Sequence, residues 1–166
     1  MTEKEALIQK RLRDEGDKLL AVFEALSPAQ WQTIIYTDGM VWTIKDLLAH
    51  QISAEREFQY YGCDILDGGQ GAPEGFVIND FNNAAVAQLT ARDVMTLIAD
   101  LRATRQTTID LVASIDEDEF ALQGRHPFFG QMTIEDMFKL IYRHNMLHLR
   151  DLRRVLDAES TSGGQS

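Results

Sequence analysis

Apolar residues recur every three or four positions along four long stretches of this chain, which is the spacing of one face of an α-helix. We expect a first helix at residues 2–26, a second at 43–61, a third helical region at 79–115 and a fourth helix at 133–156. No stretch alternates apolar and polar residues, as a half-buried strand does, over a useful length. The pattern therefore predicts an all-α protein, a bundle of four main helices with short extra helices.

A repeated capping signal marks the expected helix starts. It consists of a threonine, whose hydroxyl can accept first-turn N–H groups, and an acid three residues later at the positive end of the helix dipole. The signal occurs at three helix starts, namely Thr2 with Glu5, Thr43 with Asp46 and Thr133 with Asp136. Thr90 and Asp93 repeat it inside the third region, so we expect a break there between a short helix and a longer one. Asn79 or Asp80 is the expected cap of the short helix.

The connecting segments differ from the helices in composition. Residues 62–75 contain five glycines and one proline with little periodicity, which predicts a loop over one end of the bundle. The segment around Pro127 and Gly130 is also expected to be a loop. Residues 1–156 fit a single helical domain, and the tail at 157–166, rich in serine and glycine, is expected to be disordered.

Composition and charge narrow the classes of partner. The chain has 26 acidic and 16 basic residues and a formal net charge of −10, which repels nucleic-acid phosphates, so we expect no nucleic-acid partner. No apolar run approaches the roughly 20 residues of a membrane span, so we expect no membrane partner either. The charged N-terminal sequence without a signal-like apolar stretch, and the single cysteine Cys63, favour a cytoplasmic protein.

Three histidines form the most informative pattern. His144 and His148 are four residues apart on the apolar stripe of the fourth helix, so their imidazoles share one face. His50 lies beside the apolar stripe of the second helix, and the fourth histidine, His126, precedes Pro127 in an expected loop and is left outside the site. Neighbouring imidazoles in an apolar setting favour a shared divalent ion, and neutral imidazoles suit zinc, nickel, copper or iron(II). Manganese is kept as a further candidate. A structural histidine cluster without metal stays open as an alternative.

Carboxylates near such a site can orient an imidazole or move a proton. Asp151 is three residues after His148 and continues the line of the histidines, so it is the candidate catalytic residue, one that lies behind the metal ligands and orients an imidazole or moves a proton. Asp46 and Glu57 lie on the same side of the second helix as His50. Asp46 is also explained as a first-turn acid, and Glu57 as a residue that faces water.

Two stretches carry motifs of a known family. The first reads WTIKDLLAH and ends at His50, and the second begins MTIEDM at residue 132 and leads into HNMLH, which contains His144 and His148. Together with the helix order, these motifs resemble the DinB/YfiT-like superfamily of metal-dependent helical-bundle proteins. The resemblance implies a four-helix bundle with long crossover connections and a divalent metal held by the three histidines.

The same resemblance implies an activity. Characterised relatives are similar to transferases and isomerases that use low-molecular-weight thiols, and others look like hydrolases of small electrophiles. Many members place a glutamine soon after the last histidine, whereas this chain reads Leu149-Arg150-Asp151. Asp151 therefore stands as a substitute whose role the family does not define.

The leading interpretation is a small metalloenzyme in which the ion activates water or a low-molecular-weight thiol for attack on a small electrophilic molecule. The alternative is a non-catalytic bundle that binds metal or a small ligand in stress response or self-protection. A homodimer is compatible with the pattern, because bundles often bury a spare apolar face in a second copy, but no apolar stripe requires it.

Overall fold

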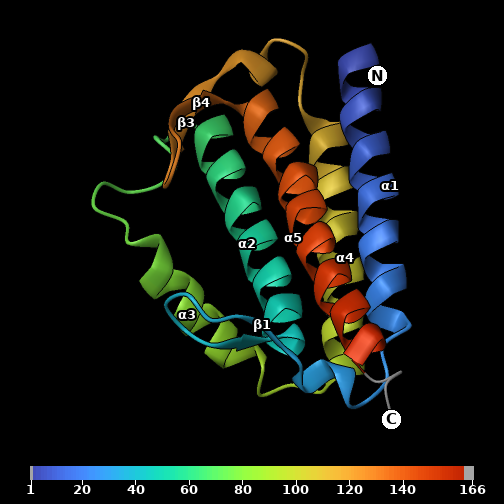
Figure 1. The fold of residues 1–166 in the computed structure, drawn as a ribbon. Coiled ribbons are helices and arrows are strands. Elements are labelled where there is room, and N and C mark those ends of the chain that lie inside the picture. The colour runs from blue at the N-terminus through green and yellow to red at the C-terminus, as the bar shows by residue number, and fades with distance from the viewer. Residues whose placement is uncertain (1, 163–166) are drawn as a thin grey trace.

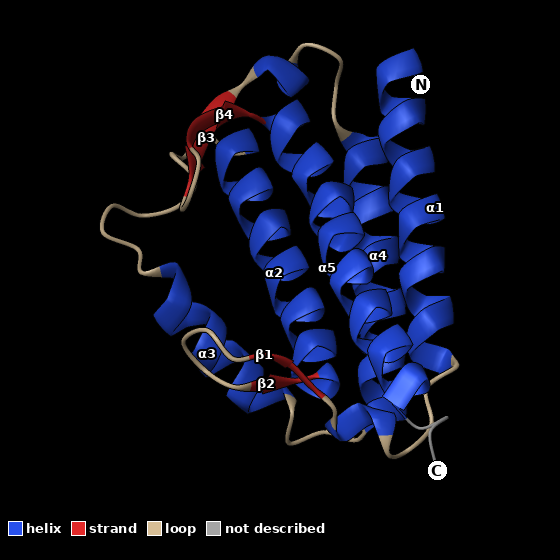
Figure 2. Cartoon of the chain, viewed as in Figure 1, coloured by secondary structure: helices blue, strands red, loops and turns tan. Residues whose placement is uncertain are grey.

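The computed structural model describes residues 2–162 of the 166-residue chain. Its α-helices are α1 (Glu3–Glu24), α2 (Ile44–Leu66), α3 (Ile78–Leu89), α4 (Val94–Ser114) and α5 (Ile134–Ser162), and two short 3₁₀ helices lie at Gln30–Gln32 and Glu119–Ala121. The long helices α1, α2, α4 and α5 form the bundle, and the shorter α3 packs beside α2 (Figures 1 and 2).

The order of the helices around the bundle differs from their order in the chain. Each of α1 and α2 packs against both α4 and α5, so α1 and α2 sit diagonally across from each other. Helices α1 and α5 run in one direction and α2 and α4 in the other, and the chain between α2 and α4 returns along the bundle through α3 (Figure 1). This arrangement confirms the predicted all-α four-helix bundle with long crossover connections and short extra helices.

Four short strands, which the sequence pattern did not predict, form two antiparallel hairpins. Strand β1 (Ile34–Tyr36) pairs with β2 (Trp42–Thr43), and β3 (Gln123–His126) pairs with β4 (Gly130–Thr133). Strands of two to four residues are too short for alternation to stand out from a loop. Each hairpin follows a 3₁₀ helix and runs directly into a bundle helix, β2 into α2 and β4 into α5. The same local unit therefore precedes both helices that carry the candidate histidines.

The predicted caps are present at three helix starts. Each threonine hydroxyl accepts the N–H of the acid three residues later, in the pairs Thr2 with Glu5, Thr43 with Asp46 and Thr133 with Asp136. The break in the third region is confirmed, but its cap is Asp93, whose carboxylate accepts a first-turn N–H at 2.9 Å, while the Thr90 hydroxyl donates back to a carbonyl of α3. Helix α3 begins after Val77, so the expected caps Asn79 and Asp80 were wrong.

Two helices extend beyond their predicted ends. Helix α2 passes through Gly62 and ends at Leu66, because Gly62 serves close packing there and does not terminate the helix. A Cβ atom at Gly62 would lie 2.9 Å from Cζ of Phe138 on α5. Helix α5 continues to Ser162, past the expected end at residue 156, and residues 163–166 of the expected disordered tail lie outside the described residues.

The buried interior consists of two apolar clusters and a polar layer. One cluster includes Phe23, Leu48 and Leu97, and the other includes Phe120 and Phe138. Each long helix places a buried polar residue between the two clusters, namely Glu15 on α1, Glu55 on α2, Arg105 on α4 and Asn145 on α5. The candidate histidines of α2 and α5 lie close to this level. Among the described helices, none is long and apolar enough to cross a membrane.

Candidate metal centre

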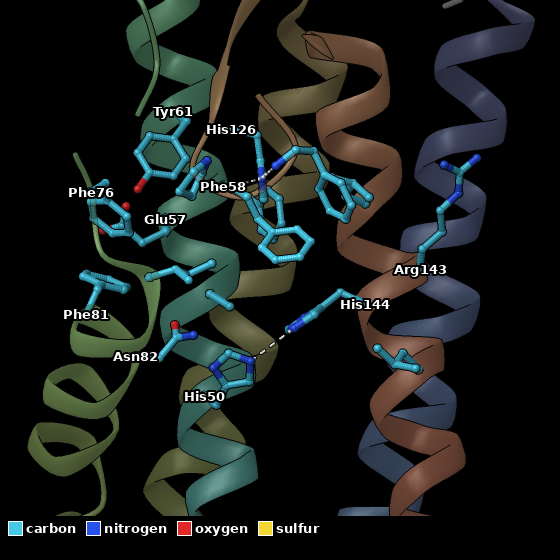
Figure 3. Close-up of a pocket in the computed structure, with 17 residues that line it drawn as sticks. His50, Glu57, Phe58, Tyr61, Phe76, Phe81, Asn82, His126, Arg143 and His144 are labelled. Carbon is cyan, nitrogen blue, oxygen red and sulfur yellow. Dashed lines mark hydrogen bonds between the residues drawn. The ribbon is translucent and has the colours of Figure 1, made fainter. Parts of the chain in front are cut away.

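Three imidazoles converge where α2 faces α5. His50 extends from α2, and His144 and His148 extend from successive turns of α5. His50 Nε2 lies 3.1 Å from His144 Nε2, and His148 Nε2 lies 2.9 Å from the same atom. Figure 3 shows His50 and His144 pointing toward each other across the gap between their helices. The fold thus brings together the three histidines that the sequence pattern selected, with one nitrogen of each within 4.8 Å of the others.

Burial keeps these imidazoles neutral. It lowers the pKa of His50, His144 and His148 from 6.5 to about 3, and the neighbouring imidazoles add to the effect. A neutral imidazole has one N–H and one lone pair, so three Nε2 atoms that face one another cannot all be satisfied within the cluster. Nitrogen ligands in a tetrahedral zinc site with bonds of about 2.05 Å lie roughly 3.3 Å apart, close to the observed spacing. The donor set therefore fits a divalent ion bound through three Nε2 atoms.

A chain of hydrogen bonds orients His148. Tyr36 Oη lies 2.7 Å from His148 Nδ1 and 3.0 Å from Asp151 Oδ2. When the Nε2 lone pair of His148 faces the cluster, its Nδ1–H donates to Tyr36 and the Tyr36 hydroxyl donates to Asp151. Burial and the Asp151 carboxylate raise the pKa of Tyr36, so this hydroxyl stays protonated. Arg150 and Arg154 lie 3.2 and 3.7 Å from Asp151 Oδ1 and balance its charge.

Helical spacing identified Asp151 but not Tyr36. The carboxylate reaches the imidazole through the tyrosine hydroxyl, and Tyr36 is 112 residues from His148 in the chain. The hairpin of β1 and β2 places Tyr36 beside the middle of α5, at His148 and Asp151, and this contact has no signal in the spacing of either segment. The feature that sequence reasoning overlooked is Tyr36, which lies in the hairpin directly before α2, the helix that carries His50.

A buried polar layer holds α2 and α5 in register next to the cluster. Gln51 and Asn145 directly follow two of the histidines, and the Asn145 amide donates to Gln51 Oε1. Arg105 of α4 donates to Asn145 and, through Nε and Nη2, to both carboxylate oxygens of Glu55 at 2.8 Å. The side chains of Arg105 and Glu55 are only 7% and 2% exposed. Such a network is strong in a low-dielectric interior and fixes the helices that carry the imidazoles.

Two cavities adjoin the cluster, and His50 and Asn82 line both. The larger, of about 380 Å³, is mainly apolar and includes five phenylalanines in its wall, Phe58, Phe76, Phe81, Phe128 and Phe129. The smaller, of about 320 Å³, is more polar than the larger one, with Tyr36, Asp38, Asn79, Asn83 and His148 in its wall, and is called the polar cavity below. Figure 3 shows Asn82 of α3 directed toward His50, at the border of the two cavities.

The remaining candidates from the sequence lie at different places. Asp46 accepts the backbone N–H of Thr43 at 2.8 Å, so it caps α2 and is explained by that role. Glu57 lines the larger cavity beside Tyr61, whose pKa is raised by burial and by this carboxylate. His126, which sequence reasoning left outside the site, is buried and also lines the larger cavity.

Comparison with known proteins places the chain in a family. A family model described as the DinB superfamily matches residues 11–152, a segment that contains His50, His144 and His148. Among curated proteins, no sequence matches the chain. The family match therefore covers the whole candidate site.

Solved structures share the fold at low sequence identity. YfiT from Bacillus subtilis, described as a probable metal-dependent hydrolase with an unusual four-helix bundle topology, is 15% identical with a TM-score of 0.76 over 96% of this chain and 90% of that one. A mycothiol-dependent maleylpyruvate isomerase is 14% identical with a TM-score of 0.74 over 92% of this chain and 63% of that one. The colibactin self-resistance protein ClbS, solved with double-stranded DNA, is 15% identical with a TM-score of 0.68 over 90% and 94% of the two chains. At these identities the likeness shows the fold alone.

Proposed function

Because the chain belongs to the DinB superfamily, we propose that it is a metal-dependent enzyme that acts on small molecules. His50, His144 and His148 would hold one divalent ion through their Nε2 atoms, with zinc, nickel, iron and manganese as candidates. The observation that carries the proposal is the convergence of three neutral imidazoles at the border of two cavities. Three protein ligands leave positions open, and an ion bound in this way lowers the pKa of a water or thiol at the open position.

The residues around the cluster would divide the other tasks. Tyr36 and Asp151 hold the proton of His148 at Nδ1, which leaves the Nε2 lone pair free as a ligand. The apolar cavity receives the electrophilic substrate and excludes water from it. The polar cavity serves as the route for water or a thiol, because the half-buried amides of Asn82 and Asn83 line it without side-chain hydrogen bonds to other described residues.

The reaction class follows from these two routes. A nucleophile that enters through the polar cavity attacks an electrophile held in the apolar one, with water giving hydrolysis and a low-molecular-weight thiol giving transfer or isomerisation. Two structural neighbours with this fold are described as a probable metal-dependent hydrolase and a mycothiol-dependent isomerase, which supports both branches of the proposal.

Metal binding is tested by substitution of one ligand. Protein purified without chelator or nickel resin should contain stoichiometric metal in elemental analysis. His148→Ala should lose this metal, while its helical circular dichroism spectrum stays unchanged. His126→Asn is the matched control and should leave the metal in place, since the hydrogen bonds of His126 go to the backbone of its own turn and not to the three Nε2 atoms. Equal metal in His148→Ala and the parent would show that the ligand assignment is wrong.

Catalysis is tested with the metal in place. Protein loaded with zinc, nickel, iron or manganese is offered thiols together with epoxides or maleyl compounds, and hydrolysis of the same electrophiles is followed without thiol. Turnover with one metal and its loss in His148→Ala would support the enzyme. Full metal loading with no turnover across the panel would instead favour the non-catalytic bundle that binds metal or a small ligand.

A further inference from the structure

His126 is a buried histidine that the proposed reaction does not use. It ends β3, and the turn that follows carries Phe128 and Phe129. The side chain is only 6% exposed, and its ring stacks on Phe58 with centroids 5.3 Å apart and an angle of 29°. Phe58 also lies 6.5 Å from the His144 ring, so His126 is about one aromatic ring away from the three-histidine cluster.

The surrounding backbone determines which nitrogen of His126 carries the proton. Nδ1 accepts the backbone N–H of Phe128 at 3.1 Å and that of Phe129 at 3.2 Å. An atom that accepts two N–H groups must present its lone pair, so the proton of the neutral ring is on Nε2. Burial lowers the pKa of His126 to about 4, which keeps the ring neutral near pH 7. Nε2–H is therefore a hydrogen-bond donor of fixed direction.

This donor is not used within the protein. Nε2 of His126 has no hydrogen-bond partner among the described residues, but it is not completely shielded from the surrounding space. It therefore keeps contact with open space, and the open space that His126 lines is the apolar cavity (Figure 3). A ligand oxygen at this place would gain a net hydrogen bond, whereas a ligand without an acceptor would cover the donor and leave it unpaired.

The cavity around this donor favours an aromatic ligand. Its phenylalanines offer faces and edges for ring stacking, and Phe128 and Phe129 are 70% and 59% exposed at its open side. Its volume of about 380 Å³ falls in the range of small-molecule sites, and is more than twice that of an engineered cavity that holds benzene. The charged residues in its wall are one acid, Glu57, and one base, Arg143, so the lining does not specify a net charge.

We propose that the apolar cavity binds a flat, one- or two-ring compound with a carbonyl or similar oxygen, and that His126 Nε2–H donates a hydrogen bond to that oxygen. The proposal names the substrate class of the proposed function. Only the statement that this ligand is the substrate rests on the proposed function. His50 and His144 line the same cavity as His126, so a ligand held in this way extends toward the three-histidine cluster. Binding itself requires neither metal nor turnover.

The test uses two probes of nearly equal size and shape, 2-acetylnaphthalene and 2-ethylnaphthalene, which differ in one carbonyl oxygen. Their affinities for the full chain are measured by fluorescence titration with and without bound metal. The parent should bind the ketone roughly three- to tenfold more tightly than the hydrocarbon, the effect of one net hydrogen bond. Equal affinity for both probes, or no binding of either, would overturn the proposal.

Two variants separate the donor from the support of the turn. In His126→Asn, Oδ1 occupies a place like that of Nδ1 and can still accept the turn N–H groups, but no donor reaches the Nε2 position. This variant should bind the hydrocarbon like the parent and show no preference for the ketone. His126→Gln places an amide N–H near the Nε2 position and should restore part of the preference. Thermal unfolding of each variant confirms that the fold persists.

Failure of this inference is distinguishable from failure of the proposed function. If the preference for the ketone persists in His126→Asn, the proposed role of His126 is refuted. Metal loading and turnover are measured separately, so the proposed function is not refuted by that result. His148→Ala, which should lose metal, should retain the preference for the ketone because Nε2 of His126 is outside the cluster. Loss of the preference in His148→Ala would contradict an independent donor site.

Discussion

Removal of a single hydroxyl, in Tyr36→Phe, should weaken metal binding while the bundle stays folded. The Tyr36 hydroxyl is the link between His148 Nδ1, at 2.7 Å, and the Asp151 carboxylate, at 3.0 Å. The phenylalanine ring keeps the packing of Tyr36 against Trp42 and His148, whose ring centroids lie 6.3 and 5.7 Å away. The substitution therefore removes the orienting bond of His148 and little else.

The size of the effect follows from what loses its partner. His148 Nδ1–H is left unpaired in a mostly buried position, whereas Asp151 keeps its contacts with Arg150 and Arg154. An unpaired buried donor costs about 1 to 3 kcal/mol, and the half-buried position of Tyr36 favours the lower part of that range for the metal-free protein. Loss of an outer partner of a metal-binding histidine weakens metal affinity roughly 10- to 100-fold.

The assay is competition for zinc against a chromophoric chelator, together with urea unfolding of the metal-free protein. Tyr60→Phe is the matched control, because Tyr60 is 61% exposed on α2 and lines neither cavity of the site. Asp151→Asn completes a double-mutant cycle with Tyr36→Phe, and the two effects should be strongly non-additive because both interrupt one chain of bonds. Parent-like zinc affinity in Tyr36→Phe, with additive effects in the cycle, would refute the orienting role of this chain.

Two further outcomes are expected. Glu55→Gln should lower the free energy of unfolding, measured in urea, by about 3 to 5 kcal/mol, because it leaves the buried Arg105 charge uncompensated. The control Glu24→Gln removes one partner of an exposed ion pair and should cost less than about 1 kcal/mol. Equal costs for the two variants would contradict the argument. The metal-free protein should lose stability as the pH falls below 6.5. All four histidines have pKa values of about 3 or 4 in the folded protein and near 6.5 in the unfolded chain, so the stability present above pH 6.5 is lost toward pH 4. Near pH 5 each histidine contributes a slope of about 1.4 kcal/mol per pH unit, and urea unfolding of His126→Asn should show a slope lower by that amount.

The long helices, and the starts of α1, α2 and α5, were predictable because their causes are local. Apolar spacing along α1, α2, α4 and α5 reflects which face each helix buries, and the threonine caps act within three residues. The ends were less predictable, since Gly62 continues α2 where the composition suggested a loop. Its role there depends on Phe138, a residue of another helix, whose ring leaves no room for a Cβ atom.

The sequence by itself determined the four amphipathic helices and the pairing of His144 with His148, because residues four apart must share a helix face. It also placed Asp151 on that face. The sequence also proposed His50 as the third histidine, but only the tertiary structure brought it beside the other two. Only the tertiary structure linked Asp151 to His148 through Tyr36 and placed His126 in the wall of the apolar cavity. The reason is physical: these contacts join residues up to 115 positions apart through the crossing of α2 and α5 and the two hairpins, and no local spacing encodes them.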